Sequence, residues 1–222
     1  MRIAALLALA TAITLGGCNA LPPSQDTSSA PVQSSPGKAV VLNSEARQCL
    51  AQLGDAGARF YPKPDKLNAG GCSISNTVRL DALGGDQRQF EVTNLPTVGC
   101  PVANSFADWA RFGVDRAARQ ILGSGLQRIE TMGSYACRNV AGTGRLSAHS
   151  RAQAVDVSGF VLADGRRITV KDGWNASRQE REFLQTIHRS ACKRFGTVLG
   201  PEYNAAHRDH LHLELGSGSF CR

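Results

Sequence analysis

The chain has 222 residues, 42% of them hydrophobic and 6% aromatic, and its formal net charge is +7. This length and hydrophobic content suffice for one folded domain with a single core. The few aromatic residues are scattered and no basic stripe runs between them, which argues against nucleic-acid binding. The positive charge suits another polyanion, such as a cell wall or a lipid surface.

The N-terminal segment has the features of an export signal. Arg2 precedes an apolar run from Ile3 to Leu15 that is too short to span a bilayer as a stable anchor. The run closes on two glycines and Cys18, which resembles a bacterial lipoprotein signal, in which the cysteine is lipidated and becomes the first mature residue. We therefore expect residues 1–18 to be a lipoprotein signal with Cys18 as the lipid attachment site; cleavage as an ordinary secretory signal is the alternative.

Residues 19–38 are rich in Ser, Pro, Gln and Thr and have almost no large apolar side chain, so a disordered tether is expected there. The folded domain is expected over residues 39–222. This domain has an even number of cysteines in an exported chain, which predicts three disulfides and leaves their pairing open. The cysteines are Cys49, Cys72, Cys100, Cys137, Cys192 and Cys221.

The spacing of apolar residues predicts a mixture of helices and strands. The helix over 177–194 has a capping box, Ser177 with Glu180, and is expected to end at Gly196. Because strands and helices do not alternate regularly, the fold class is predicted as α+β, a single domain with a mainly antiparallel sheet flanked by helices. In chain order, the predicted elements are helices over 44–53 and 104–122, strands over 127–131, 154–162 and 167–170, a helix over 177–194, and strands over 197–199 and 210–215.

Histidine is scarce, with five in the chain, yet His207, His210 and His212 fall within six residues. Residues 210–215 alternate strictly, so a strand would turn the leucines to the core and His210, His212 and Glu214 to the opposite face. The two imidazoles are then neighbours. Neutral imidazole is a preferred ligand of catalytic zinc.

A second polar segment carries His149 and Asp156. Asp156 lies at the start of an apolar stretch, where a carboxylate is costly unless it is paired or binds a cation. Taken alone, either segment is explained equally well by a helix cap, an ion pair or a surface histidine. Together the two segments predict a zinc site, in which three protein ligands leave a fourth position for water.

These residues resemble the signatures of known families. The spacing of Ser147, His149 and Asp156, followed by His210-x-His212, resembles the LAS metallopeptidases, which include D-Ala-D-Ala carboxypeptidases and the zinc fold of hedgehog. The wider context resembles the bacterial extensin-like C-terminal domain family, over nearly all of the region from Cys49 to Cys221. This second resemblance is carried by residues 135–138, 145–147, 156–160 and 195–201.

The resemblance implies a hedgehog-like or D-Ala-D-Ala-peptidase-like fold. It also implies Zn2+ held by His149, Asp156 and His212. Ala152 stands where a glycine is usual, a change that the backbone tolerates if φ is negative there.

The same resemblance implies that His210 lies near the metal and acts in catalysis, with His207 beside it. The carboxypeptidase branch has a glutamate as general base where this chain has His207. The pattern His207-x-x-His210-x-His212 is instead similar to the penicillin-insensitive murein endopeptidases.

Five further polar residues are interpreted individually. Arg138 is a candidate for binding a substrate carboxylate, the alternative being a structural arginine beside a disulfide. Ser147 is expected to orient the loop or a metal ligand through a hydrogen bond. Asp209 and Glu214 are interpreted as exposed charges, the alternative being partners that support the metal ligands, and His188 is interpreted as a surface histidine outside the site.

The leading prediction is zinc-dependent hydrolysis of peptide bonds in peptidoglycan stems or cross-links, by an endopeptidase rather than a carboxypeptidase. The protein is expected to be a lipid-anchored monomer in the periplasm of a bacterial cell envelope. One alternative is a non-catalytic, zinc-containing lipoprotein that binds peptidoglycan, which the replacement of the usual glutamate by His207 keeps open. Another is a disulfide-rich structural domain without metal.

Overall fold

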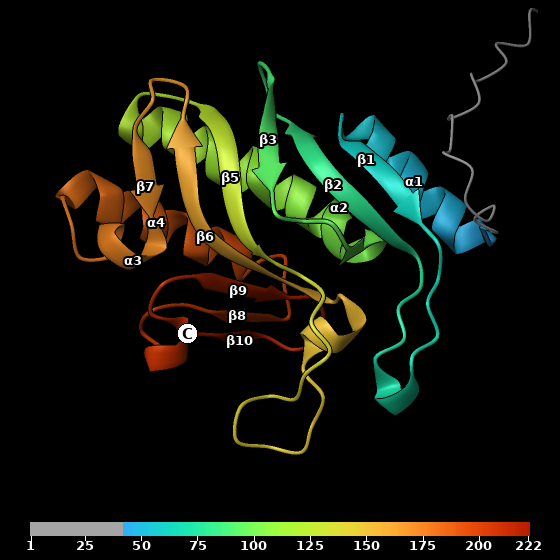
Figure 1. Cartoon of the computed structure of the whole chain (residues 1–222). Helices are drawn as coiled ribbons and strands as arrows, with labels where there is room; N and C mark the ends of the chain where they lie inside the picture. The colour runs from blue at the N-terminus through green and yellow to red at the C-terminus, as the bar shows by residue number, and fades with distance from the viewer. Residues whose placement is uncertain (1–41) are drawn as a thin grey trace, which may run out of the picture. The chain divides into compact units, whose positions relative to one another are not determined.

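The computed structural model describes residues 42–222, shown in Figure 1. The predicted signal with Cys18, the predicted tether and residues 39–41 of the predicted domain therefore lie outside the described residues. In the described range, no helix is long and apolar enough to cross a membrane.

A sheet forms the centre of the fold. Its ten strands in the described range are β1 (Arg59–Lys63), β2 (Thr77–Gly84), β3 (Gln89–Thr93), β4 (Val98–Gly99), β5 (Leu126–Gly133), β6 (Ala154–Leu162), β7 (Arg167–Thr169), β8 (Thr197–Leu199), β9 (Leu211–Glu214) and β10 (Phe220–Cys221). The strand order is β1-β2-β3-β5-β6-β9-β8-β10, with β4 paired to β2 and β7 to β6. Among these pairs only β3–β5 and β8–β10 are parallel. The predicted α+β class with a mainly antiparallel sheet is thus confirmed.

The longer helices lie behind the sheet in Figure 1. The α-helices are α1 (Ser44–Asp55), α2 (Cys100–Asp108), α3 (Val170–Gly173) and α4 (Arg178–Ala191). α4 begins after Ser177, whose hydroxyl accepts a hydrogen bond from the amide of Glu180, as the sequence predicts. The helix ends at Ala191, before the predicted end at Gly196, because the chain turns there to enter β8.

The helix predicted over 104–122 is longer and less regular than expected. It begins at Cys100, with Pro101 in its first turn, where the missing proline N–H is not needed. Beyond α2 the chain continues in the wider π-helical segments η2 (Trp109–Asp115) and η3 (Ala118–Leu122). A left-handed glycine, Gly123 with φ 74°, ends the run.

Aromatic side chains fill the space between this long helical segment, α4 and the sheet. Phe160 of β6 lies 5.4 Å from Phe183 of α4 and 6.3 Å from Trp109, measured between ring centroids. The Trp109 indole donates a hydrogen bond of 2.9 Å to the carbonyl of Ile187. All of these aromatic side chains are fully buried, so one face of β6 is anchored in the core.

Three disulfides are present among the described residues, as the cysteine count predicts. Cys49–Cys100 joins α1 to α2, Cys72–Cys137 joins the β1–β2 connection to the loop after β5, and Cys192–Cys221 joins the end of α4 to β10. The third pair ties the C-terminal strand to the rest of the domain. The expected likeness to the hedgehog and D-Ala-D-Ala peptidase fold stays a prediction.

Candidate metal centre

Two of the predicted metal ligands lie opposite each other on neighbouring strands. Asp156 of β6 is paired with His212 of β9 in the antiparallel register. Side chains of paired residues point to the same face of a sheet and lie close together. Their sequence neighbours Val157 and Leu213 are fully buried in the core on the other face. The alternation predicted for 210–215 therefore sends His212 to the face away from the core.

The third predicted ligand, His149, comes from the short 3-10 helix η4 (Ala148–Arg151). Ser147 precedes this turn, and its hydroxyl accepts a hydrogen bond of 3.4 Å from the amide of His149. Ala152 follows with φ 55°, in the left-handed region, so the condition of a negative φ, under which the replacement of glycine by alanine is tolerated, is not met. The chain reverses there within one residue: the amide of Ala152 donates to the carbonyl of His149, and that of Gln153 to Ala148. A left-handed residue permits this reversal.

The three side chains converge closely. His149 Nε2 lies 3.2 Å from Asp156 Oδ2 and 3.2 Å from His212 Nδ1, and His212 Nδ1 lies 2.9 Å from Asp156 Oδ1. Ligand atoms at zinc distances in a tetrahedron are roughly 3.3–3.6 Å from one another. The cluster of His149, Asp156 and His212, called the metal-binding cluster below, thus already has nearly the spacing that a tetrahedral ion requires.

Hydrogen bonds on the far ring nitrogens leave the near nitrogens free to bind a cation. His149 Nδ1 lies 2.6 Å from the carbonyl of Ser134, which can only accept, so Nδ1 carries the proton and Nε2 has the lone pair. His212 Nε2 lies 3.3 Å from a carboxylate oxygen of Glu214, which leaves His212 Nδ1 facing the cluster. The donor set is therefore two imidazole nitrogens and one carboxylate, a set that suits zinc.

The electrostatics of the metal-binding cluster favour a charged carboxylate beside a positive charge. Burial opposes ionisation of Asp156, but the neighbouring imidazoles of His149 and His212 hold the pKa of this carboxyl well below its usual range. Burial also disfavours a charged His212, yet Asp156 and Glu214 together raise the pKa of this imidazole to about 9. Positive charge is thus stabilised at the position where a cation would bind.

The two other predicted histidines lie beside the metal-binding cluster. His210 Nε2 is 3.8 Å from Asp156 Oδ1, and its Nδ1 is 2.9 Å from the carboxylate of Asp209. The His207 ring lies 5.1 Å from that of His210, and its Nδ1 is 2.8 Å from the side-chain oxygen of Asn204. Burial and the neighbouring imidazoles lower the pKa of His207 to about 4, so its neutral form is favoured.

Arg138 lies at the rim of this group. Its side chain is exposed, and its charge is close enough to His207 to contribute to the lowered pKa of that imidazole. The carbonyl of Arg138 accepts a hydrogen bond from the amide of Ser147, so the two predicted residues belong to adjoining segments. The structure thus brings together every residue predicted for the site and leaves His188 outside it, against Trp174.

Several residues that hold the site were not assigned to it from the sequence. Asp209 and Glu214, interpreted first as exposed charges, are hydrogen-bonded to His210 and His212, as the alternative of a supporting role requires. The sequence did contain a signal for Glu214: it alternates strictly with His212 and is therefore expected on the same face of the strand. Ser134 contributes through its main-chain carbonyl, which every residue type has, and therefore leaves no signal in the sequence.

A second group of potential ligands, His188, Cys192 and Cys221, does not offer a comparable site. Its two cysteines form a disulfide with each other. Disulfide sulfurs are not the thiolates that bind zinc. The metal-binding cluster is thus the stronger of the two groups in the described residues.

The comparisons with known proteins give one match. No curated protein and no solved structure matches the chain significantly. The family described as extensin-like protein C-terminus matches residues 47–222, which include the whole metal-binding cluster and all three disulfides. The chain therefore belongs to the extensin-like protein C-terminus family.

Proposed function

We propose that the protein is a zinc metallopeptidase that hydrolyses peptide bonds in the stems or cross-links of peptidoglycan. The observation that carries this proposal is the convergence of His149, Asp156 and His212 on one buried point, with His210 beside it. The likeness of these residues to the LAS metallopeptidase signature supports the same reaction class.

Zinc is proposed as the cation because of the donor set. Two imidazoles and one carboxylate are typical of catalytic zinc sites, in which three protein ligands leave a fourth position for water or substrate. What zinc supplies when bound is Lewis acidity, which polarises the scissile carbonyl and makes the attacking water more acidic.

His210 is proposed as the group that moves the proton. Its Nδ1 is engaged by Asp209, so its Nε2, which faces the metal-binding cluster, is free to accept a proton from the attacking water. His207 is held by Asn204 in the same way and can orient the water or take part in the proton transfer. Arg138, exposed at the rim, is proposed to bind a carboxylate of the substrate.

The substrate and location are proposed from the sequence. An export signal that resembles a lipoprotein signal, with Cys18 at its end, and a net charge of +7 suit a lipid-anchored periplasmic protein acting on an anionic wall. His207 stands in place of the glutamate of the carboxypeptidase branch, which favours an endopeptidase. We propose that the protein acts as a monomer and binds no nucleic acid.

A second candidate function is a non-catalytic, zinc-containing lipoprotein that binds peptidoglycan. The same replacement favours this function, because His207 stands at the position where the carboxypeptidase branch has its general base. In that case the metal would organise a binding surface.

Digestion of purified sacculi tests the proposal. Zinc-loaded wild type is expected to convert cross-linked muropeptides to monomers, and His210→Ala to be at least about 100-fold slower while it keeps its zinc, because the proton acceptor is lost. Muropeptides are quantified by mass spectrometry and zinc by elemental analysis. His188→Gln, which alters a histidine outside the site, is the matched control and should digest like wild type.

Two results would contradict this scheme. Unchanged muropeptides with a folded, zinc-loaded wild type that still sediments with sacculi would favour the binding lipoprotein. A protein that holds no stoichiometric zinc, even after reconstitution, would exclude both zinc-dependent functions and favour a structural domain.

A further inference from the structure

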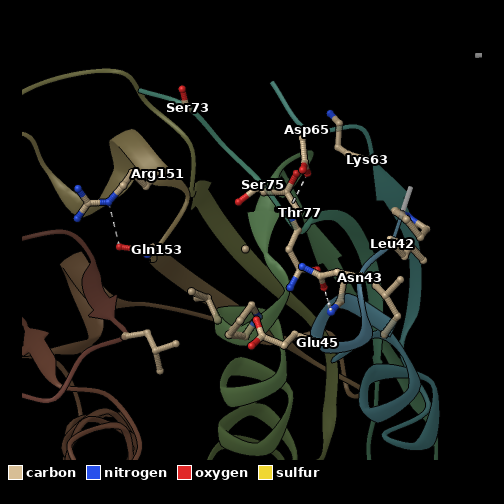
Figure 2. A pocket seen from close by; sticks show the side chains of 18 residues that line it. Leu42, Asn43, Glu45, Lys63, Asp65, Ser73, Ser75, Thr77, Arg151 and Gln153 are labelled. Carbon is tan, nitrogen blue, oxygen red and sulfur yellow. Dashed lines mark hydrogen bonds between the residues drawn. The ribbon is translucent and has the colours of Figure 1, made fainter. Parts of the chain in front are cut away.

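A cavity of about 360 Å3 lies in another part of the domain (Figure 2). Its walls are formed by the N-terminal ends of α1 and α2, the end of β1, the start of β2, and the end of η4 with the residues that follow it. No residue of the metal-binding cluster lines it, and neither His207 nor His210 does. The volume is in the range of small-molecule sites.

Opposite charges stand on opposite sides of this cavity. Figure 2 shows Arg151 with Gln153 on one side, and Glu45 and Asp65 on the other. The Arg151 side chain is exposed and donates to its neighbour Gln153 at 3.3 Å. Asp65 uses one oxygen to accept the amide of Asn76. Among the ion pairs of the described residues, none involves Arg151, Glu45 or Asp65.

The other cation at the cavity is already engaged. The Lys63 ammonium donates to the carbonyl of Pro96 and to the hydroxyl of Thr97, both at 3.0 Å. Arg151 is therefore the lining cation that is best able to bind an anionic group. Its planar guanidinium matches a carboxylate with two parallel hydrogen bonds.

A buried hydroxyl also lines the cavity without a partner. Thr77 is 2% exposed, and its Oγ1 has no hydrogen-bond partner among the described residues. Burying an unpaired hydroxyl destabilises a fold, whereas valine has the same shape and is as well suited to a strand. A polar ligand in the cavity would explain why a threonine occupies this position.

We propose that this cavity binds a small zwitterion, an amino acid or a dipeptide with a free ammonium and a free carboxylate. Arg151 binds the carboxylate, Glu45 and Asp65 bind the ammonium, and the Thr77 hydroxyl binds a polar group between them. The proposal does not depend on the proposed hydrolysis.

The cavity and the metal-binding cluster nevertheless share a segment of chain. Arg151 follows His149 by two residues, and Gln153 precedes Asp156 by three. Ala152 lies between Arg151 and Gln153. Its carbonyl accepts a hydrogen bond of 2.9 Å from the amide of Gly99, which lines the cavity. Zinc content is therefore measured for every variant, so that a change in ligand binding is not confused with loss of the metal.

Calorimetric titration of the full chain with alanylalanine tests the proposal, with and without a chelator to separate the cavity from the metal-binding cluster. We expect saturable binding in both conditions. N-acetylated and C-amidated alanylalanine, each lacking one charge, should bind at least about tenfold more weakly. Arg151→Gln and Thr77→Val should each weaken binding of the unmodified dipeptide about tenfold.

Matched controls separate binding from folding. Arg178→Gln changes an exposed arginine that does not line the cavity and should bind like wild type. Thr77→Val should unfold at a temperature no lower than wild type, because it removes an unpaired buried hydroxyl. Absence of saturable binding up to about 10 mM, equal binding of the blocked dipeptides, or wild-type affinity in both cavity variants would overturn the proposal.

Discussion

Each imidazole of the metal-binding cluster is oriented by the ring nitrogen that faces away from the cluster. His149 donates to the carbonyl of Ser134, and His212 contacts the carboxylate of Glu214. Such a hydrogen bond selects one tautomer and makes the opposite nitrogen a stronger ligand. Ser134 and Glu214 therefore belong to the site although neither is expected to bind the metal.

The first prediction at the residue scale concerns Glu214. Glu214→Gln should lower zinc affinity by about 10- to 100-fold, because a neutral amide supports the His212 N–H less strongly than a carboxylate does. Competition with a chromophoric zinc chelator measures this change. Glu182→Gln, which alters an exposed glutamate of α4, is the control. Equal zinc affinity of Glu214→Gln and wild type would show that Glu214 does not support the site.

The sequence pointed to the residues of the metal-binding cluster and to Ser147 as one support, but not to the Ser134 carbonyl. His212 and Asp156 could be predicted because strict alternation and an uncompensated carboxylate are local signals. The contact of the Ser134 main-chain carbonyl with His149 could not be predicted, because the position of this carbonyl depends on how β5 and the loop after it pack against η4. The left-handed φ of Ala152 is likewise set by the reversal between η4 and β6.

At the scale of elements, apolar periodicity located the helices better than the strands. It predicted a helix over 104–122 but did not reveal the π-helical turns of η2 and η3, which change the period only locally. β1, β2, β3, β4 and β10 were not predicted. β1 contains Pro62 and lies at the edge of the sheet, where a residue without an N–H is tolerated, and β4 and β10 are two residues each.

A close approach of two helical segments gives the prediction at this scale. A Cβ on Gly113 of η2 would lie 2.4 Å from Ser190 Oγ of α4 and 3.1 Å from Trp109 Cδ1. Gly113→Ala should therefore destabilise the fold by about 1–3 kcal/mol, measured by urea unfolding, because the core cannot accept the extra methyl without moving. Adding Ser190→Ala should recover part of this loss.

Gly54 provides the matched control for this substitution. It lies in α1, and no atom lies within 4 Å of a Cβ built on it. Gly54→Ala should therefore stabilise the protein by about 0.5–1 kcal/mol through helix propensity alone. Equal effects of the two alanine substitutions would mean that η2 and α4 are not closely packed at Gly113.

At the scale of the whole molecule, His188 makes stability depend on pH. Burial lowers the pKa of this imidazole below 6.5, more than the Arg222 carbonyl and Glu202 raise it, and Arg189 lowers it further. At pH values between the lowered pKa of His188 in the folded protein and 6.5, its value in the unfolded chain, the unfolded chain binds more protons than the folded protein does. The contribution of His188 is therefore fully present above pH 6.5 and is lost as the pH falls through the folded value.

Comparison of wild type with His188→Gln isolates this contribution. Wild type should lose more unfolding free energy than the variant when the pH falls from about 7 to about 5, measured by urea unfolding in the presence of a chelator. His207 and His212 also titrate, but they are present in both proteins and cancel in the difference. Parallel pH profiles of the two proteins would contradict the predicted role of His188.

The amino-acid sequence by itself determined the fold class, the number of disulfides and the two polar segments that form the metal-binding cluster, whereas the choice of His212 over His210 as a ligand came from the family resemblance. These follow from local quantities: the period of apolar residues, an even cysteine count, and rare polar residues at fixed spacings. The tertiary structure decided the cysteine pairing, the order of the strands, the supports of the two imidazoles and the cavity beside α1. Each of these depends on contacts between segments far apart in the chain, whose free energy no local pattern encodes.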